Sequence, residues 1–176
     1  MCRFTRDHGF EKPHDASGLA LMNAAAKETM KEFPGDLRLA FGESDEYSFV
    51  FDKNTKLYQR RASKLVSLVV SCFTGNYVRL WQEYFPRMPL SRVPLFDGRA
   101  VAYPSLKTLR DYLSWRQADT HINCQYNTCY WLLMKEMQDR EAVQKVLQGT
   151  LTADKNELLY QRGINYNDIP EMYRKG

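Results

Sequence analysis

The amino-acid sequence predicts an α+β fold in which an antiparallel sheet carries helices on one face and a mostly helical part follows. Three patterns predict it: apolar residues at helical spacing over 15–33, strand-like runs at 37–41 and 47–51 around a polar turn, and a long helical pattern over 60–85. With a short strand-like run at 99–103, the order matches a β-α-β-β-α-β sheet whose first strand is missing.

The first helix is expected between Asp15 and Phe33. Asp15 or Ser17 suits the N-cap position, and Pro34-Gly35 suits the end of the helix. Residues 1–14 are too polar, and alternate too little, to supply the leading strand.

A β-hairpin and a second long helix follow. The polar stretch Gly42–Glu46 separates the two strand-like runs and predicts an acidic hairpin tip. The helix is expected from about Arg60 to Phe85, because its apolar residues return to one face. Its start is strongly basic.

From Ser105 onward the sequence predicts mostly helices. Ser105 suits the N-cap of a helix through 106–115, and further helical patterns cover 122–137 and 141–147. A short turn is expected after Thr152, followed by a polar, irregular tail.

No repeat, low-complexity tract or Gly/Ser linker marks a clean domain boundary. The strand-like run at 99–103 ends at Pro104, and helical patterns dominate after it. We therefore expect a sheet-containing domain at 1–104, without its first strand, and an incomplete, mostly helical part at 105–176.

The composition indicates a folded intracellular protein. Of the 176 residues, 44% are hydrophobic, which is enough apolar surface to offset the entropy of ordering the chain. No apolar run approaches a bilayer span, and residues 1–6 lack the apolar stretch of a secretory signal, so we expect no membrane contact. The four cysteines form no CxxC pair, which indicates reduced thiols. A net charge of +4 is compatible with a polyanionic partner but does not require one.

Ser44-Asp45-Glu46 places two carboxylates at the predicted hairpin tip. Mg²⁺ prefers carboxylate and water oxygens and shares its coordination sphere with substrate phosphates, so the tripeptide suits a metal site for phosphoryl chemistry. The alternative is an ordinary acidic turn, because Ser and Asp favour turns for local reasons.

Arg60, Arg61 and Lys64 lie within about one turn at the start of the second long helix. Together with the helix dipole, such a face can hold a triphosphate or a nucleic-acid 5′ end. The alternative is a solvated basic face that continues from Lys53 and Lys56.

Two single residues of the C-terminal part are further candidates. His121 lies in a polar row, and either a structural hydrogen bond or a catalytic or phosphate-binding role is consistent with that pattern. Lys155 suits either a phosphate contact or a solvated helix start.

Aromatic and cationic residues before His121 offer a base-stacking alternative. Tyr112, Trp115, Arg116 and Gln117 could stack on nucleobases, although aromatic residues at helical spacing more often belong to a core. Asp97 lies in an Asp-Gly-Arg turn that resembles a metal-binding turn, but it follows the hairpin and long helix, so we interpret it as structural.

Several separated segments, taken together, resemble the eukaryotic tRNA-His guanylyltransferase family in order and spacing, over nearly the whole chain. They are His8–Pro13, Gly42–Phe49, Arg60–Ser67, Asp111–Asp119, His121–Asn123 and Leu151–Glu157. The resemblance implies a polymerase-palm fold, with 1–104 as the palm-like catalytic domain. It also implies addition of guanylate to the 5′ end of tRNA-His in the 3′-to-5′ direction, with ATP activation, GTP and two Mg²⁺ ions.

The resemblance also assigns roles to residues and an assembly to the family. Asp45 would be a catalytic metal ligand supported by Glu46, and Ser44 would contact the triphosphate. The phosphates would be held by Lys12, Arg61 and Lys64, and the tRNA end and transfer step would be handled by His121 and Lys155. Family members are expected to form tetramers.

This sequence departs from the family pattern at both ends. The family's Asp-Gly-Arg strand, which supplies the second set of metal ligands, would lie upstream of residue 1, so we expect a truncated chain, and the sequence leaves open whether it is active in this form. The alternative is a noncatalytic tRNA-binding or subunit-interacting paralogue. A generic ATP- or GTP-binding regulator is disfavoured because no Gly-rich P-loop occurs. The sequence does not distinguish cytoplasm, nucleus and mitochondrion.

Overall fold

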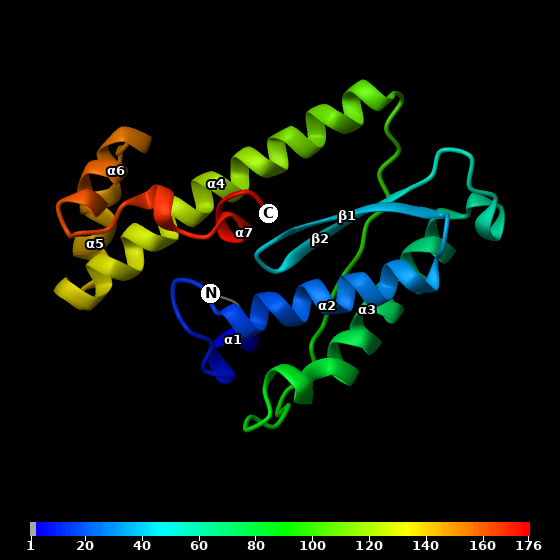
Figure 1. Cartoon of the computed structure of the whole chain (residues 1–176), viewed down its shortest axis with the longest axis horizontal. Helices are drawn as coiled ribbons and strands as arrows, with labels where there is room; N and C mark the ends of the chain where they lie inside the picture. The colour runs from blue at the N-terminus through cyan, green and yellow to red at the C-terminus, as the bar shows by residue number, and fades with distance from the viewer. Residues whose placement is uncertain (1–2) are drawn as a thin grey trace. The chain divides into compact units, whose positions relative to one another are not determined.

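The computed structural model describes residues 3–176 (Figure 1). The chain divides after Pro104 into two compact units, and each is described by itself. We call residues up to Pro104 unit 1 and residues from Ser105 unit 2.

Unit 1 contains a hairpin and two long helices, with two shorter pieces. Its elements are α1 (Arg3–Asp7), α2 (Ala16–Glu32), β1 (Leu37–Glu43), β2 (Glu46–Phe51), the 3₁₀ turn η1 (Leu57–Arg60) and α3 (Ala62–Tyr84). The α+β class, the two long helices and the antiparallel hairpin predicted from the sequence are confirmed.

The start of α2 is determined by its capping residue. The side chain of Asp15 accepts a hydrogen bond from the backbone N–H of Gly18 at 2.7 Å, which satisfies one of the unpaired donors of the first turn. The helix ends at Phe33, directly before Pro34 and Gly35, as the sequence predicts.

The core of unit 1 lies where α2 packs along α3. It contains Leu21 and Ala25 of α2, both 0% exposed, and Trp81 of α3 at 2%. The indole N–H of Trp81 donates to the carbonyl of Met88 at 2.7 Å, so its only polar group is satisfied. The same cluster receives side chains from one face of the hairpin, and α2 and α3 therefore cover that face.

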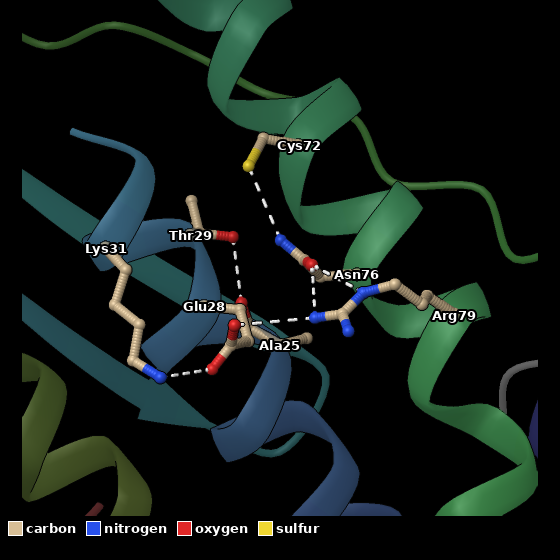
Figure 2. A network of polar contacts seen from close by, with 7 residues as sticks. All are labelled: Ala25, Glu28, Thr29, Lys31, Cys72, Asn76 and Arg79. Carbon is tan, nitrogen blue, oxygen red and sulfur yellow. Dashed lines mark hydrogen bonds and ion pairs between the residues drawn. The ribbon is translucent and has the colours of Figure 1, made fainter.

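The outer side of the α2–α3 contact is held by a polar network, which Figure 2 shows. Glu28 of α2 pairs with Lys31 at 2.6 Å and with Arg79 of α3 at 3.4 Å. Arg79 also donates to the side-chain oxygen of Asn76 at 3.1 Å. Because Lys31 and Arg79 are exposed and Glu28 is only partly buried, these ion pairs contribute little to stability.

The hairpin strands extend further toward the tip than the sequence suggests. The ladder continues to the Glu43–Glu46 pair, so only Ser44 and Asp45 form the turn. Ser44 has a positive φ of 54°, as two-residue hairpin turns require.

A tyrosine anchors the hairpin near its tip. Tyr47 lies opposite Gly42 in the ladder, and its hydroxyl donates a hydrogen bond to the side-chain oxygen of Asn23 on α2. Its ring centroid is 5.6 Å from that of Phe73 on α3. One side chain therefore ties the hairpin to both helices.

The prediction of a strand at 99–103 is wrong. Those residues form no ladder, and the sheet of the described chain has only β1 and β2. The segment just before it packs on α3 instead: Phe96 lies edge-on to Phe73 at 4.9 Å, and Gly98 is in close contact with Val70. A strand needs a neighbouring edge to accept its hydrogen bonds, and neither strand of the hairpin pairs with this segment.

Unit 2 is helical. Its elements are α4 (Leu106–Met137), α5 (Arg140–Leu147), α6 (Thr152–Tyr160), the 3₁₀ turn η2 (Tyr166–Asp168) and α7 (Glu171–Arg174). The two helices expected over 106–115 and 122–137 are one continuous helix, because no Gly or Pro interrupts the residues between them. The turn expected after Thr152 is a nine-residue helix.

The core of unit 2 lies against the second half of α4. Cys129 and Leu133 of α4 pack with Val143 of α5 and Leu159 of α6. The first residue of α4 that is buried is Thr120, so the first half of the helix contributes nothing to this core. In residues 3–176 no helix has both the length and the apolar character needed to cross a membrane.

Truncating a core residue of α2 should destabilise the fold. Leu21→Ala leaves a cavity at a fully buried position, and we expect the free energy of unfolding to fall by about 3 kcal/mol. Urea unfolding followed by circular dichroism measures the change. The matched control is Leu95→Ala, because Leu95 is 91% exposed, and an equal loss in both variants would contradict the assigned core.

The buried phenol of Tyr47 should make stability depend on alkaline pH. Burial raises the pKa of Tyr47 to about 12, whereas an unfolded tyrosine ionises near pH ~10. The stability that the protonated phenol contributes is therefore fully present below pH ~10, and it is lost as the pH rises toward the pKa of Tyr47 in the folded protein. In urea unfolding across this range, Tyr47→Phe should lose stability less steeply than the wild type. Parallel losses would show that the phenol is not buried.

Candidate functional site

The hairpin tip presents the predicted metal-binding residues to solvent. Ser44, Asp45 and Glu46 are all exposed. Within residues 3–176 the carboxylate of Asp45 has no ion-pair partner, so it is accessible to a ligand. Glu43, directly opposite Glu46 in the ladder, is buried at 7% exposure, so carboxylates gather at both ends of this turn. Such a concentration of negative charge favours binding of a cation.

Lys12 lies at the same end of unit 1 as the hairpin tip. It precedes α2 by a few residues, and Figure 1 shows the start of α2 beside the tip. The neighbouring His14 is neutral at pH 7, because burial and, to a smaller extent, the charge of Lys12 lower the pKa of its imidazole. The segment that carries Lys12 therefore enters α2 at the end beside the turn.

Arg61 and Lys64 lie at the other end of the hairpin. β2 separates them from the tip, and its six residues span about 20 Å. Thr55, which follows β2, donates a hydrogen bond to the carboxylate of Asp36, which precedes β1. The segment leading to Arg61 is thus held at the open end of the hairpin (Figure 1). Arg61 and Lys64 therefore lie about one strand length from the turn that carries Asp45.

Arg60 does not belong to the basic helix face that the sequence predicts. α3 begins at Ala62, and the guanidinium of Arg60 donates to the carbonyls of Lys53 at 3.1 Å and Thr55 at 3.4 Å. Tyr58, Gln59 and Arg60 all have positive φ, between 48° and 58°. Arg60 therefore stabilises a left-handed turn before the helix rather than facing a ligand.

The turn before α3 arranges the two remaining cations around Tyr58. The guanidinium of Arg61 donates to the carbonyl of Tyr58 at 3.4 Å, and the ammonium of Lys64 lies 5.5 Å from the centre of its ring. All three residues are exposed. Phosphate binding is possible here, and Tyr58 is a neighbour that the sequence did not single out.

In unit 2, His121 and Lys155 lie on two helices that are joined by a buried glutamine. Gln125, one turn after His121 on α4, donates to the carbonyl of Thr152 at 3.2 Å and to the side-chain oxygen of Asn156 at 2.7 Å. The Nδ1 atom of His121 is 3.2 Å from the hydroxyl of Tyr166. The ammonium of Lys155 donates to the carbonyl of Thr150 at 2.7 Å. Both candidate side chains thus have fixed neighbours.

The aromatic residues of the base-stacking alternative are not core residues. Trp115 is 58% exposed, and the guanidinium of Arg116 lies 4.7 Å from the centre of its ring. Tyr112 is a ring neighbour of Trp115 at 6.1 Å. Asp97, interpreted as structural, is exposed and forms an ion pair with the exposed Arg99, at 3.4 Å.

A hollow on unit 1 lies apart from these candidates. It is between α2 and α3 and is lined mainly by charged and aliphatic side chains: Ala24, Lys27, Glu28, Met30, Lys31, Leu80, Glu83 and Tyr84. No predicted site residue lines it.

Comparisons with known proteins cover both units. A family model described as tRNAHis guanylyltransferase matches residues 2–104, and one described as the Thg1 C terminal domain matches residues 107–176. The tRNA(His) guanylyltransferase of Neurospora crassa is 53% identical over 99% of this chain and 60% of its own length. A probable tRNA(His) guanylyltransferase of Drosophila melanogaster is 52% identical over 99% of this chain and 61% of its own length.

Solved structures agree with this match. The crystal structure of the tRNA(His) guanylyltransferase from Saccharomyces cerevisiae has a TM-score of 0.94 at 48% identity, over 98% of this chain and 77% of that one. A bacterial guanylyltransferase-like protein in complex with ATP has the same fold, with a TM-score of 0.79 at 24% identity over 98% of this chain and 72% of that one. The chain spans about 60% of the length of the first two curated relatives. The resemblance inferred from the separated motifs is confirmed: the chain belongs to the tRNA-His guanylyltransferase family.

Proposed function

We propose that this chain is a nucleotidyltransferase that adds guanylate to the 5′ end of tRNA-His. ATP first adenylylates the 5′-monophosphate and releases pyrophosphate. The 3′-hydroxyl of GTP then attacks the activated phosphorus and displaces AMP, and hydrolysis finally removes pyrophosphate from the triphosphate of the added guanylate. The observation that carries the proposal is the exposed carboxylate of Asp45, on a two-residue turn next to Ser44 and Glu46, in a chain of this family. We further propose that the protein acts inside the cell, as a tetramer.

The residues of the turn fit a magnesium site that is completed by substrate. Mg²⁺ is usually held by one or two protein carboxylates, with water and phosphate oxygens filling the other positions. Residues 3–176 contain no cluster of three or more His, Cys, Asp or Glu side chains that could hold a metal ion. The turn instead offers two carboxylates, the number that Mg²⁺ usually takes from a protein. We propose Asp45 as the ligand, supported by Glu46. The ions, two in the family, would neutralise phosphate charge when bound.

The two ends of the hairpin would hold different phosphate groups. Ser44 and Lys12 are at the tip end and would contact the triphosphate near the carboxylates. Arg61 and Lys64 are about one strand length away, so they would hold a second anion, either the activating nucleotide or the tRNA backbone. Keeping Arg61 and Lys64 away from the turn would prevent these two cations from forming ion pairs that compete with a metal ion.

His121 and Lys155 would act on the tRNA end. Both lie on helices braced by Gln125, and Tyr166 restricts the orientation of the imidazole of His121. We propose that these side chains position the 5′ end of tRNA for transfer, with 1–104 as the palm-like catalytic domain and 105–176 as its helical partner.

A second candidate function is tRNA binding without catalysis. The exposed indole of Trp115 beside Arg116 favours it, because stacking on a nucleobase requires an open aromatic face. Incorporation of radiolabelled GTP into 5′-monophosphorylated tRNA-His separates the two functions. Salt-sensitive tRNA binding without any incorporation would favour the second.

Removing the hairpin carboxylate should abolish transfer without unfolding the protein. For Asp45→Ala we expect GTP incorporation to fall by about 100-fold or more, as losses of a group that stabilises transition-state charge do. The matched control is Asp97→Ala, which removes another exposed carboxylate of unit 1. Near-normal turnover of the Asp45 variant, with unchanged Mg²⁺ dependence, would overturn the assignment of this turn.

Removing the ammonium of Lys64 should weaken the use of nucleotide or tRNA. We expect Lys64→Ala to raise the KM for ATP or for tRNA by about 10-fold, the usual size of one lost charge-assisted contact. Lys56→Ala is the control, because Lys56 is also exposed and lies on the same basic stretch. Equal effects of both variants would indicate a general charge effect and contradict a specific phosphate contact.

A further inference from the structure

The hairpin tip needs an anchor beyond its own ladder. A two-stranded hairpin is marginally stable by itself in water, and the described sheet contains only β1 and β2. The turn residues Ser44 and Asp45 are exposed and have no core contacts. The position of the turn must therefore be set by the side chains next to it.

Tyr47 is the side chain best placed to set that position. It follows Glu46 directly, and its hydroxyl bonds to Asn23 on α2 while its ring packs near Phe73 on α3 and near Phe49 at 5.8 Å. The half-buried phenol is tied to two helices at once.

Gly42 leaves the space that this tyrosine occupies. A Cβ atom at Gly42 would lie 2.6 Å from the Cζ atom of Tyr47 and 2.8 Å from its hydroxyl oxygen. Both distances are too short for real contacts, so any side chain at position 42 would push the ring off the β1 backbone. The backbone of Gly42 is extended, so the requirement for glycine here is steric.

We infer that Tyr47 is the positioning residue of the hairpin tip: its ring, lying across Gly42 and bonded to Asn23, holds Asp45 and Glu46 in place relative to α2. The inference rests on the proposed function for the role of Asp45. Ligand groups in a phosphoryl-transfer site must be held within about 0.5 Å, so a small displacement of this turn would weaken metal and triphosphate binding together.

Two substitutions test the anchor by different routes. Gly42→Ala displaces the ring, and we expect about 10-fold weaker binding of Mn²⁺ in the presence of GTP, measured by electron paramagnetic resonance. Tyr47→Phe keeps the ring but removes the bond to Asn23, and we expect about 3-fold weaker binding. In both variants the Mg²⁺ concentration for half-maximal GTP incorporation should rise in parallel.

The matched control is Gly75→Ala on α3, where a Cβ would meet nothing within 4 Å. It should leave metal binding unchanged. A double variant, Gly42→Ala with Tyr47→Ser, checks the cause: once the ring is gone, alanine at position 42 should add no further loss. An additive loss would mean that Gly42 acts without Tyr47 and would overturn the inference.

The outcomes separate this inference from the proposed function. If Asp45→Ala abolishes Mn²⁺ binding but Tyr47→Phe and Gly42→Ala bind it normally, Tyr47 does not position the tip and only the inference fails. If Asp45→Ala itself binds Mn²⁺ normally, the proposed metal site fails. If Gly42→Ala does not fold, Tyr47→Phe alone decides, because loss of one hydroxyl keeps the aromatic packing.

Discussion

Unit 1 depends on the aromatic contact between a two-stranded hairpin and the pair of helices beneath it. Two strands alone do not bury enough surface to persist in water. Tyr47 and Phe49 reach the cluster formed by α2 and α3, and Phe73 lies within 6 Å of both ring centres. Each such aromatic pair contributes about 1 kcal/mol beyond its buried area. These few contacts therefore hold the hairpin in one position relative to α2 and α3.

The same arrangement keeps the carboxylates of the turn apart from the exposed cations Arg61 and Lys64. The carboxylates gather at the turn, while Arg61 and Lys64 lie beyond the open end, about a strand length away. If they were adjacent, the cations would form ion pairs with Asp45 and compete with a metal ion. A protein that handles more than one phosphate group gains from this separation, because each anion then meets its own set of charges.

The helices and the hairpin could be predicted because their signals are local. Asp15 is a capping residue at the start of a periodic apolar pattern, and alternating strands flank a polar turn. The strand expected at 99–103 could not be judged this way, because a strand exists only where another edge accepts its hydrogen bonds. The prediction that Arg60 belongs to the basic helix face was wrong for a related reason. A left-handed turn directs its side chain to nearby carbonyls, and sequence spacing does not indicate positive φ at non-glycine residues.

The residues that sequence reasoning missed are those that act through contacts across the chain. Nothing in the sequence near the acidic tripeptide indicates that Tyr47 bonds to Asn23, or that position 42 has no room for a side chain. Trp115 shows the converse, because an aromatic residue at helical spacing is buried only if another element covers it. The first half of α4 has no such cover within unit 2, so the indole of Trp115 stays exposed although the spacing of the aromatic residues around it suits a core.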